Sequence, residues 1–140
     1  MQYNGTDFVK VVHAISAASI TATSTSSAAI DTKGFTEAIV IANFGKAGSS
    51  AEADVFVMES VSTTAASFAH IAGSSFTQVT PTAGTFASQC LSIDLTKRKR
   101  YLRVKNKGDG TNAVVLSANV LLLNGNSLPV SQSATEVTRI

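Results

Sequence analysis

Apolar residues recur at every second position along much of this chain, whereas stretches with a helical period are hard to find. The alternation is cleanest in residues 89–95 and 101–107, and it is longest in residues 113–123. A period of two is typical of strands that bury one face. The inward-facing positions of these three segments are the expected core: Leu91, Ile93, Leu102, Val104, Leu116 and Val120.

Further strands are expected where short apolar runs lie between clusters of Gly, Asn, Asp and Ser. Residues 37–44 are apolar at nearly every position, which predicts a central strand. Residues 14–29 are rich in Ser, Thr and Ala; we expect a paired strand here, with disorder as the alternative. The remaining predicted strands are residues 7–13, 53–60, 67–71 and 75–80.

Turns are predicted from residues that tolerate unusual backbone angles. Residues 31–35 form a turn in which Gly34 can take a positive φ, and residues 81–84 form another. Residues 107–112 (KGDGTN) fit a hairpin turn between two strands. The polar tail, residues 124–140, is expected to extend along a neighbouring molecule or to fray.

These elements predict an all-β fold. The 140 residues suit a single domain, residues 1–140, folded as an antiparallel β-sandwich of jelly-roll type with about eight strands. The core is expected over about residues 7–123, with extended termini on both sides. The single cysteine, Cys90, excludes an intrachain disulfide. No apolar run is long enough for a membrane helix, and the N-terminus does not resemble a signal peptide, so we expect a protein made in the host cytoplasm with no membrane partner.

Positive charge is concentrated in one short segment. The net charge is only +2, yet residues 97–107 (KRKRYLRVKNK) hold seven of the eleven Lys and Arg residues and no acid. Three interpretations compete: a nuclear-import signal, a nucleic-acid site, and an outward strand face that meets an acidic partner. We favour the third, because the charges follow a strand alternation and only Tyr101 offers a stacking ring nearby. Within it, Arg100 or Arg103 can instead pair internally with an acid such as Asp94.

Candidate catalytic chemistry is sparse. His13 and His70 are the only histidines, and no local motif joins either of them to Cys90 as a nucleophile and base. Glu52 and Asp54 lie two apart on one strand face, but the sequence has no cluster typical of a metal site and no phosphate-binding loop. The sequence therefore predicts a non-enzymatic protein with no metal and no cofactor.

Four segments carry a resemblance to a known family: IDTKGFTEAIVIANFG (30–45), VFVMESVSTTAASFAHIAGSSFTQVT (55–80), IDLTKRKRYLRVK (93–105) and AVVLSANVLLLNGNSLPV (113–130). Their order resembles the small β-sandwich proteins of tailed-bacteriophage head gene clusters that serve as capsid decoration, or cement, proteins. The phrase RKRYLRVK is the most specific part. Many relatives carry a Trp where this chain has Phe68.

The resemblance implies a virion protein on the capsid exterior that binds the major capsid protein and bridges neighbouring capsomers. It also implies self-association, as a homotrimer or a dimer, so that many weak contacts act together. The expected charged contacts are Arg98, Lys99, Arg100 and Arg103. The expected clamps come from the two termini, with Tyr3, Phe8, Leu128 and Val130.

Three other functions compete with this one. A tail- or fibre-associated adhesion module would bind a host glycan or protein through exposed aromatic rings. A nucleic-acid-binding barrel would use the basic segment, although the rest of the chain is acidic. A small hydrolase is disfavoured by the two histidines.

Overall fold

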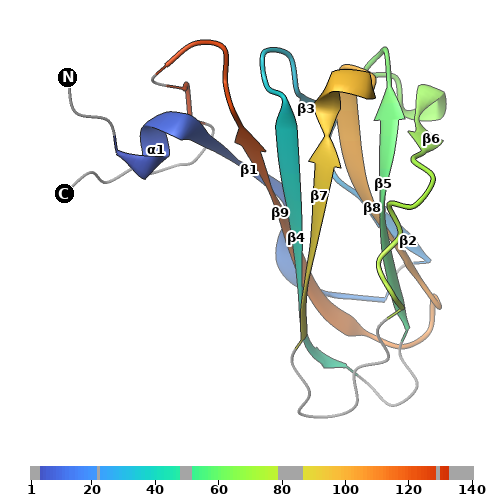
Figure 1. The fold of residues 1–140 in the computed structure, drawn as a ribbon. Helices are drawn as coiled ribbons and strands as arrows, with labels where there is room; N and C mark the ends of the chain where they lie inside the picture. Colours follow the sequence, from blue (N-terminus) through green and yellow to red (C-terminus); the bar gives the residue numbers. More distant parts are fainter. Residues whose placement is uncertain (1–3, 22, 48–51, 79–86, 129, 133–140) are drawn as a thin grey trace.

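A computed structural model describes residues 4–21, 23–47, 52–78, 87–128 and 130–132. The turn expected at residues 81–84, Tyr3 and residues 133–140 of the tail lie outside these ranges. The described residues form two facing antiparallel sheets, so the expected all-β sandwich is confirmed (Figure 1). No helix in the described ranges has the length and apolar character needed to cross a membrane.

The strands divide between two sheets. Sheet A has the order β1 (Val9–Ile20), β9 (Val114–Leu123), β4 (Glu37–Ala47) and β7 (Ala87–Asp94). Sheet B has the order β2 (Ser24–Ser26), β8 (Tyr101–Gly108), β5 (Ala53–Ser60) and β6 (Ala69–His70), and β3 (Ile30–Asp31) also pairs with β8. The helical elements are short: α1 (Gly5–Phe8), η1 (Ala65–Ser67) and η2 (Leu95–Lys97).

The pairing is that of a long hairpin rolled into two layers. Near the ends of the chain β1 pairs with β9, and the next strands inward, β2 and β8, pair with each other. Closer to the middle β4 pairs with β7, and β5 with β6. Such nested pairing, closed by contacts between β9 and β4 and between β8 and β5, is the jelly-roll arrangement.

The core lies between the sheets and consists of the inward-facing residues of each strand. On β9 every second residue from Val114 to Leu122 is buried, and on β8 Leu102 and Val104 are fully buried. On β7 Ile93 is buried and Leu91 is half-buried against the core. The expected core positions are therefore confirmed, because a strict period of two leaves only one face for them.

The segment after β8 differs from the sequence expectation. Residues 107–112 do not close a hairpin, because β8 belongs to sheet B and β9 to sheet A. Gly110 takes φ +79°, and Asp109 Oδ1 accepts the backbone N–H groups of Thr111 and Asn112. The turn chemistry was recognised correctly, but the turn carries the chain from one sheet to the other.

Three further segments differ from the strands expected from the sequence. The first strand does not begin at residue 7, because Asn4 and Asp7 form a capping box that starts the one-turn helix α1. Residues 14–20 continue β1 on sheet A. Residues 75–78 are not a strand: Gly73 turns the chain at φ +80°, and the Ser74 hydroxyl accepts the Val57 N–H and donates to the Val57 carbonyl.

Candidate binding surfaces

The seven cations of the basic segment occupy two adjoining places. Residues 97–100, which we call the cationic turn, connect β7 with β8 at one end of the sandwich. Arg103, Lys105 and Lys107, which we call the cationic face, lie on the outward side of β8. The alternation of β8 causes this arrangement, because its other positions, Leu102 and Val104, point into the core.

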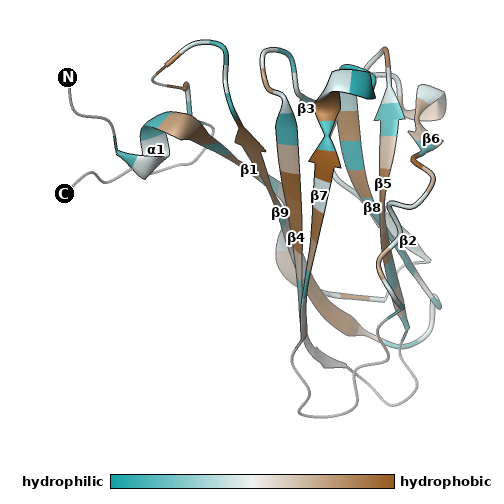
Figure 2. Cartoon of the chain, in the orientation of Figure 1, coloured by the Kyte–Doolittle hydropathy of each residue, from teal (hydrophilic) through white to brown (hydrophobic). Residues whose placement is uncertain are grey.

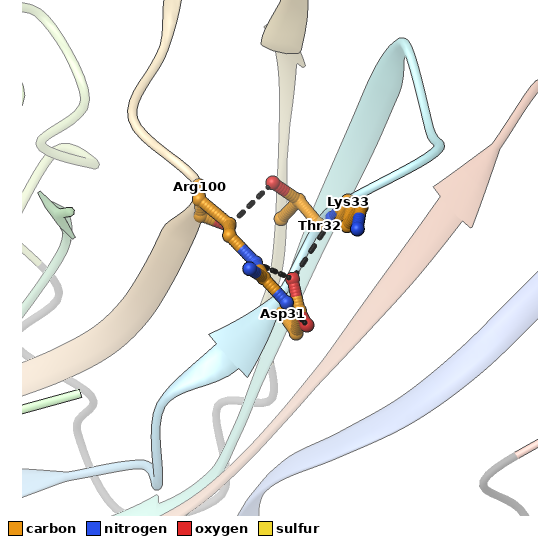
Figure 3. A network of polar contacts seen from close by, with 4 residues as sticks. All are labelled: Asp31, Thr32, Lys33 and Arg100. Carbon is orange, nitrogen blue, oxygen red and sulfur yellow. Dashed lines mark hydrogen bonds and ion pairs between the residues drawn. The ribbon is translucent and has the colours of Figure 1, made fainter. Parts of the chain in front are cut away.

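Arg100 is held by Asp31 of β3, the short strand that pairs with the start of β8 (Figure 3). Its Nε and Nη2 donate to Asp31 Oδ1 and Oδ2 at 2.9 and 2.7 Å, a bidentate pair with both side chains about half exposed, at 47%. Thr32 donates from its backbone N–H and its hydroxyl to the Arg100 carbonyl at 3.0 and 2.7 Å. The hydrogen bonds from Arg100 hold the pKa of Asp31 below its ordinary value, and Asp31 raises the pKa of Arg100.

A second acid holds the turn from β5. Glu59 Oε2 accepts the backbone N–H of Lys99 at 3.0 Å, and its Oε1 lies 3.7 Å from Arg98 Nη1. The Glu59 side chain is only 16% exposed, which makes it a fixed support for the backbone of the turn. Arg98 and Arg100 are therefore both paired within the chain, whereas Lys97 and Lys99 expose their side chains.

The expected internal ion pair exists, but its acid is Asp31 and not Asp94. Asp94 Oδ1 instead accepts the backbone N–H and the hydroxyl of Thr96, at 2.9 and 2.7 Å, and so caps η2. These hydrogen bonds lower the pKa of Asp94. The Asp94 carboxylate is already hydrogen-bonded to Thr96, two residues along the chain. Asp31 pairs with Arg100 instead, because β3 lies next to the start of β8.

On the cationic face, Arg103 lies over an aromatic ring. Its guanidinium carbon is 4.6 Å from the centre of the Phe68 ring, and Phe68 is itself buried. The Arg103 Nε atom is buried and has no hydrogen-bond partner among the described residues. Phe68 thus positions Arg103, a contact that no spacing or motif in the sequence indicates.

Lys105 and Lys107 extend the cationic face towards an open cavity of about 440 Å³. In the pairing of β5 with β8, Phe56 lies opposite Lys105 and Asp54 opposite Lys107. The ring of His70 meets that of Phe56 edge-on, at 5.1 Å between centres, and His70 Nε2 lies 3.1 Å from the Ser75 hydroxyl. The cavity is lined by Asp54, Phe56, His70, Ser75, Phe76 and Lys107.

The terminal residues expected as clamps fall into different environments. Phe8 and Leu128 are exposed at 43% and 40%, whereas Val130 is buried. The described part of the tail returns to its own chain, where Val130 N–H donates to the Asp7 carbonyl at 3.0 Å. Gln132 bonds to the backbone of Thr6, Val9 and Val11, so the described end of the tail is held against its own chain.

The groups considered for catalysis do not meet. Cys90 and His13 lie in the same row of sheet A with two strands between them, about 14 Å apart at the usual strand spacing. His13 instead contacts Asn119 and Ser16, and His70 lies on sheet B. Among the described residues there is no group of three His, Cys, Asp or Glu side chains placed to hold a metal ion.

Comparison with known proteins supports the fold. No protein-family model matches this chain, and no curated protein matches it significantly. Among solved structures, the chain is similar to the PBSX exported protein XepA, with 16% sequence identity and a TM-score of 0.56. The match covers 100% of this chain and 45% of XepA, so the chain spans less than half the length of that protein.

Proposed function

We propose that this chain is a non-enzymatic structural protein of a phage particle, which binds the outside of the major capsid shell and joins neighbouring capsomers. The similarity to XepA, a protein of the phage PBSX, supports the phage origin, and its description as exported is compatible with a place outside the shell. The sequence resemblance to capsid decoration proteins supports the more specific role.

The observation that carries the proposal is the layout of the basic segment. Acidic side chains of the described ranges pair with only two of its cations, Arg98 and Arg100. The cationic face on the outward side of sheet B and the lysines of the cationic turn at one end of the sandwich therefore have no acidic ion-pair partner among the described residues, and they are available to an acidic surface. Charges arranged in this way steer association and fix the orientation of the partner, and salt weakens their effect.

A double variant and a control variant test this proposal. Lys105→Ala with Lys107→Ala removes two cations from the cationic face, and Lys10→Ala removes a cation from β1 on sheet A. Binding to purified empty shells is measured by co-sedimentation at low and physiological salt. We expect the first variant to bind about 10-fold more weakly and to depend less on salt, and the second to bind like the wild type. Equal effects of the two variants, or no binding of the wild type, would contradict the proposal.

One observation favours a second function, a tail- or fibre-associated module that binds a host glycan. The cavity beside β5 combines the rings of Phe56, Phe76 and His70 with polar side chains, a composition that suits a sugar ring with its apolar face and hydroxyl groups. Phe56→Ala separates the two functions. It would remove glycan binding on a host-glycan array but leave shell binding intact.

A further inference from the structure

A cavity of about 280 Å³ lies where the turn before β4 meets the loop after β9. The described part of the tail and the start of β1 complete its walls. Figure 2 shows teal, hydrophilic stretches in the turn and in the loop, in contrast with the brown strands that they continue. Six side chains give the cavity its chemistry: Lys10, Lys33, Phe35, Asn126, Ser127 and Ser131.

The walls of the cavity are held together by direct contacts. The backbone N–H of Asn126 donates to the Gly34 carbonyl at 2.8 Å, and Gly34 takes φ +87°, which favours glycine. Gly125 lies so close to its neighbours that a Cβ atom there would be 2.7 Å from Val130 Cγ1 and 3.2 Å from Phe35 Cε1. The turn, the loop and the tail therefore pack against one another, and contacts within the chain suffice to shape the cavity.

Lys10 reaches this cavity from an unusual position, because it lies on the inward side of β1. It pairs with Leu122, which is fully buried between the sheets, and Val12, two residues further along β1, packs against the core. Alternation therefore places the Lys10 side chain on the inner side of the sheet, where it is half-buried. A nearby negative charge stabilises a partly buried ammonium group, since burial removes part of its hydration.

No such negative charge comes from the described part of the chain. Ion pairs between these residues join acids only to Arg98 and Arg100. The second cation of the cavity, Lys33, lies two residues after Asp31, but both carboxylate oxygens of Asp31 accept hydrogen bonds from Arg100. No described residue that lines the cavity is acidic. Two lysines without an acidic counterpart in these ranges predict an anionic ligand.

Protection of the sheet edge does not account for Lys10. An inward-pointing lysine on an edge strand can hinder the addition of another strand. At this edge, however, Gln132 already accepts the Val11 N–H at 3.1 Å and donates to the Val9 carbonyl at 2.6 Å. The hydrogen-bonding groups beside Lys10 are therefore occupied, and the lysine is left for a ligand.

The remaining lining side chains suit a sugar. The Phe35 ring is half-buried and offers an apolar surface, while Asn126, Ser127 and Ser131 are exposed and offer amide and hydroxyl groups. Small-molecule sites commonly combine apolar walls with a few polar groups, and about 280 Å³ is at the small end of their volumes. That size suits a single sugar ring with a charged substituent.

We propose that this cavity binds a sugar that carries a carboxylate or phosphate group. Lys10 and Lys33 hold the anionic group, while Phe35 and the hydroxyl groups of Ser127 and Ser131 hold the ring. The site differs from the cationic face and from the cavity beside β5, and so it goes beyond the proposed function. Its test uses the isolated full chain without shells.

Titration calorimetry of the full chain at low salt compares four probes: glucuronate, glucose 6-phosphate, glucose and inorganic phosphate. We expect at least one of the two anionic sugars to bind with one-to-one stoichiometry, at least about 10-fold more tightly than glucose or inorganic phosphate. The tighter of the two anionic sugars identifies the charged group. If neither binds at about 10 mM, or if inorganic phosphate binds as tightly as both, the inference is overturned.

Lys10→Gln and Lys105→Gln form a matched pair of variants, because each removes one cation from a half-buried strand position. Lys105 lies on the outward side of β8, away from the cavity. We expect Lys10→Gln to bind the anionic sugar about 10-fold more weakly or not at all, and Lys105→Gln to bind it like the wild type. Circular dichroism checks that both are folded. Equal losses in the two variants would indicate attraction by net charge alone and would overturn the inference.

Nuclear magnetic resonance of the wild type locates the ligand without any substitution. The amide signals of Gly34, Gly125 and Asn126 should shift as the anionic sugar is added, whereas those of Phe56 and Ser75, in the cavity beside β5, should stay in place. Shifts confined to Phe56 and Ser75 would place the sugar in the other cavity and overturn the inference.

Discussion

The outward faces of the two sheets differ in chemistry, although their inward faces are alike. Both sheets bury small and medium aliphatic side chains against each other. Outward, sheet A presents aliphatic residues that include Val11, Ile39 and Leu121, whereas the central strand β8 of sheet B presents Arg103, Lys105 and Lys107. Inward positions of a sandwich are constrained by packing, and so the outward positions are free to determine what the protein binds.

The difference also extends to how the side chains are held. On sheet B, Arg103 is fixed over Phe68, and the adjoining Arg98 and Arg100 are fixed by acids. On sheet A, Val11 is 37% exposed, and Gln132 of the tail is hydrogen-bonded to its backbone at the edge of β1. A positioned cationic surface favours a defined orientation on an acidic partner.

The largest expected effect on stability comes from placing an acid at an inward position of β8 and not at an outward one. Val104→Asp places a carboxylate in the fully buried core and should destabilise the fold by about 4 kcal/mol or more, which is a large part of the stability of an ordinary domain. Lys105→Asp, one residue further along, puts the same acid on the outward side. It should change the free energy of unfolding by no more than about 1 kcal/mol.

Urea unfolding followed by circular dichroism measures both variants. A folded, sheet-rich Val104→Asp, or two equally unstable variants, would show that β8 does not separate core from surface as described.

A smaller effect is expected at the edge of sheet A. Gln132→Ala removes three hydrogen bonds to the backbone of Thr6, Val9 and Val11, and should cost about 1–2 kcal/mol. Hydrogen exchange locates the effect, because the Val11 amide should exchange at least about 10-fold faster. Ser131→Ala, at the exposed neighbouring position, is the control. Unchanged exchange at Val11 would mean that the tail does not protect this edge.

The smallest effect concerns the ion pair beside the cationic turn. Asp31 has a lowered pKa in the folded protein, so its stabilising contribution is present above the ordinary carboxyl pKa and is lost as the pH falls through the folded value. The wild type should be slightly more stable than Asp31→Asn at neutral pH, and the difference should shrink as the pH falls below the ordinary carboxyl pKa and vanish once Asp31 is protonated in the folded protein. Thermal unfolding across pH measures it. A difference that grows on acidification would contradict the sign of this contribution.

Much of the sandwich could be predicted from the sequence because a period of two assigns each side chain to a face. This explains why β4, β5, β7, β8 and β9 and their core positions agree with the expectation. Which strands pair with each other, and in which sheet, could not be inferred in the same way. The turn at Asp109 and Gly110 looks locally like a hairpin, and only the long-range pairing of β9 with β1 and β4 places its two sides in different sheets.

The candidate surfaces were predicted only in part. The basic segment was visible in the sequence, but its fixing partners Asp31, Glu59 and Phe68 come from distant parts of the chain that sequence spacing does not relate to it. The aliphatic residues on the outward side of β4 could be anticipated from the sequence. Residues 37–44 are apolar on both sides, which was interpreted as a central strand, and β4 is indeed central. The same pattern also implies aliphatic residues on the outside.

Electron microscopy of empty shells mixed with the wild-type protein tests the central claim most directly, since it shows which side of the sandwich meets the shell. The account predicts density on the outside of the shell, with β8 of sheet B turned towards the shell. Shells without added density, or sandwiches that contact the shell through sheet A with β8 facing solvent, would contradict it.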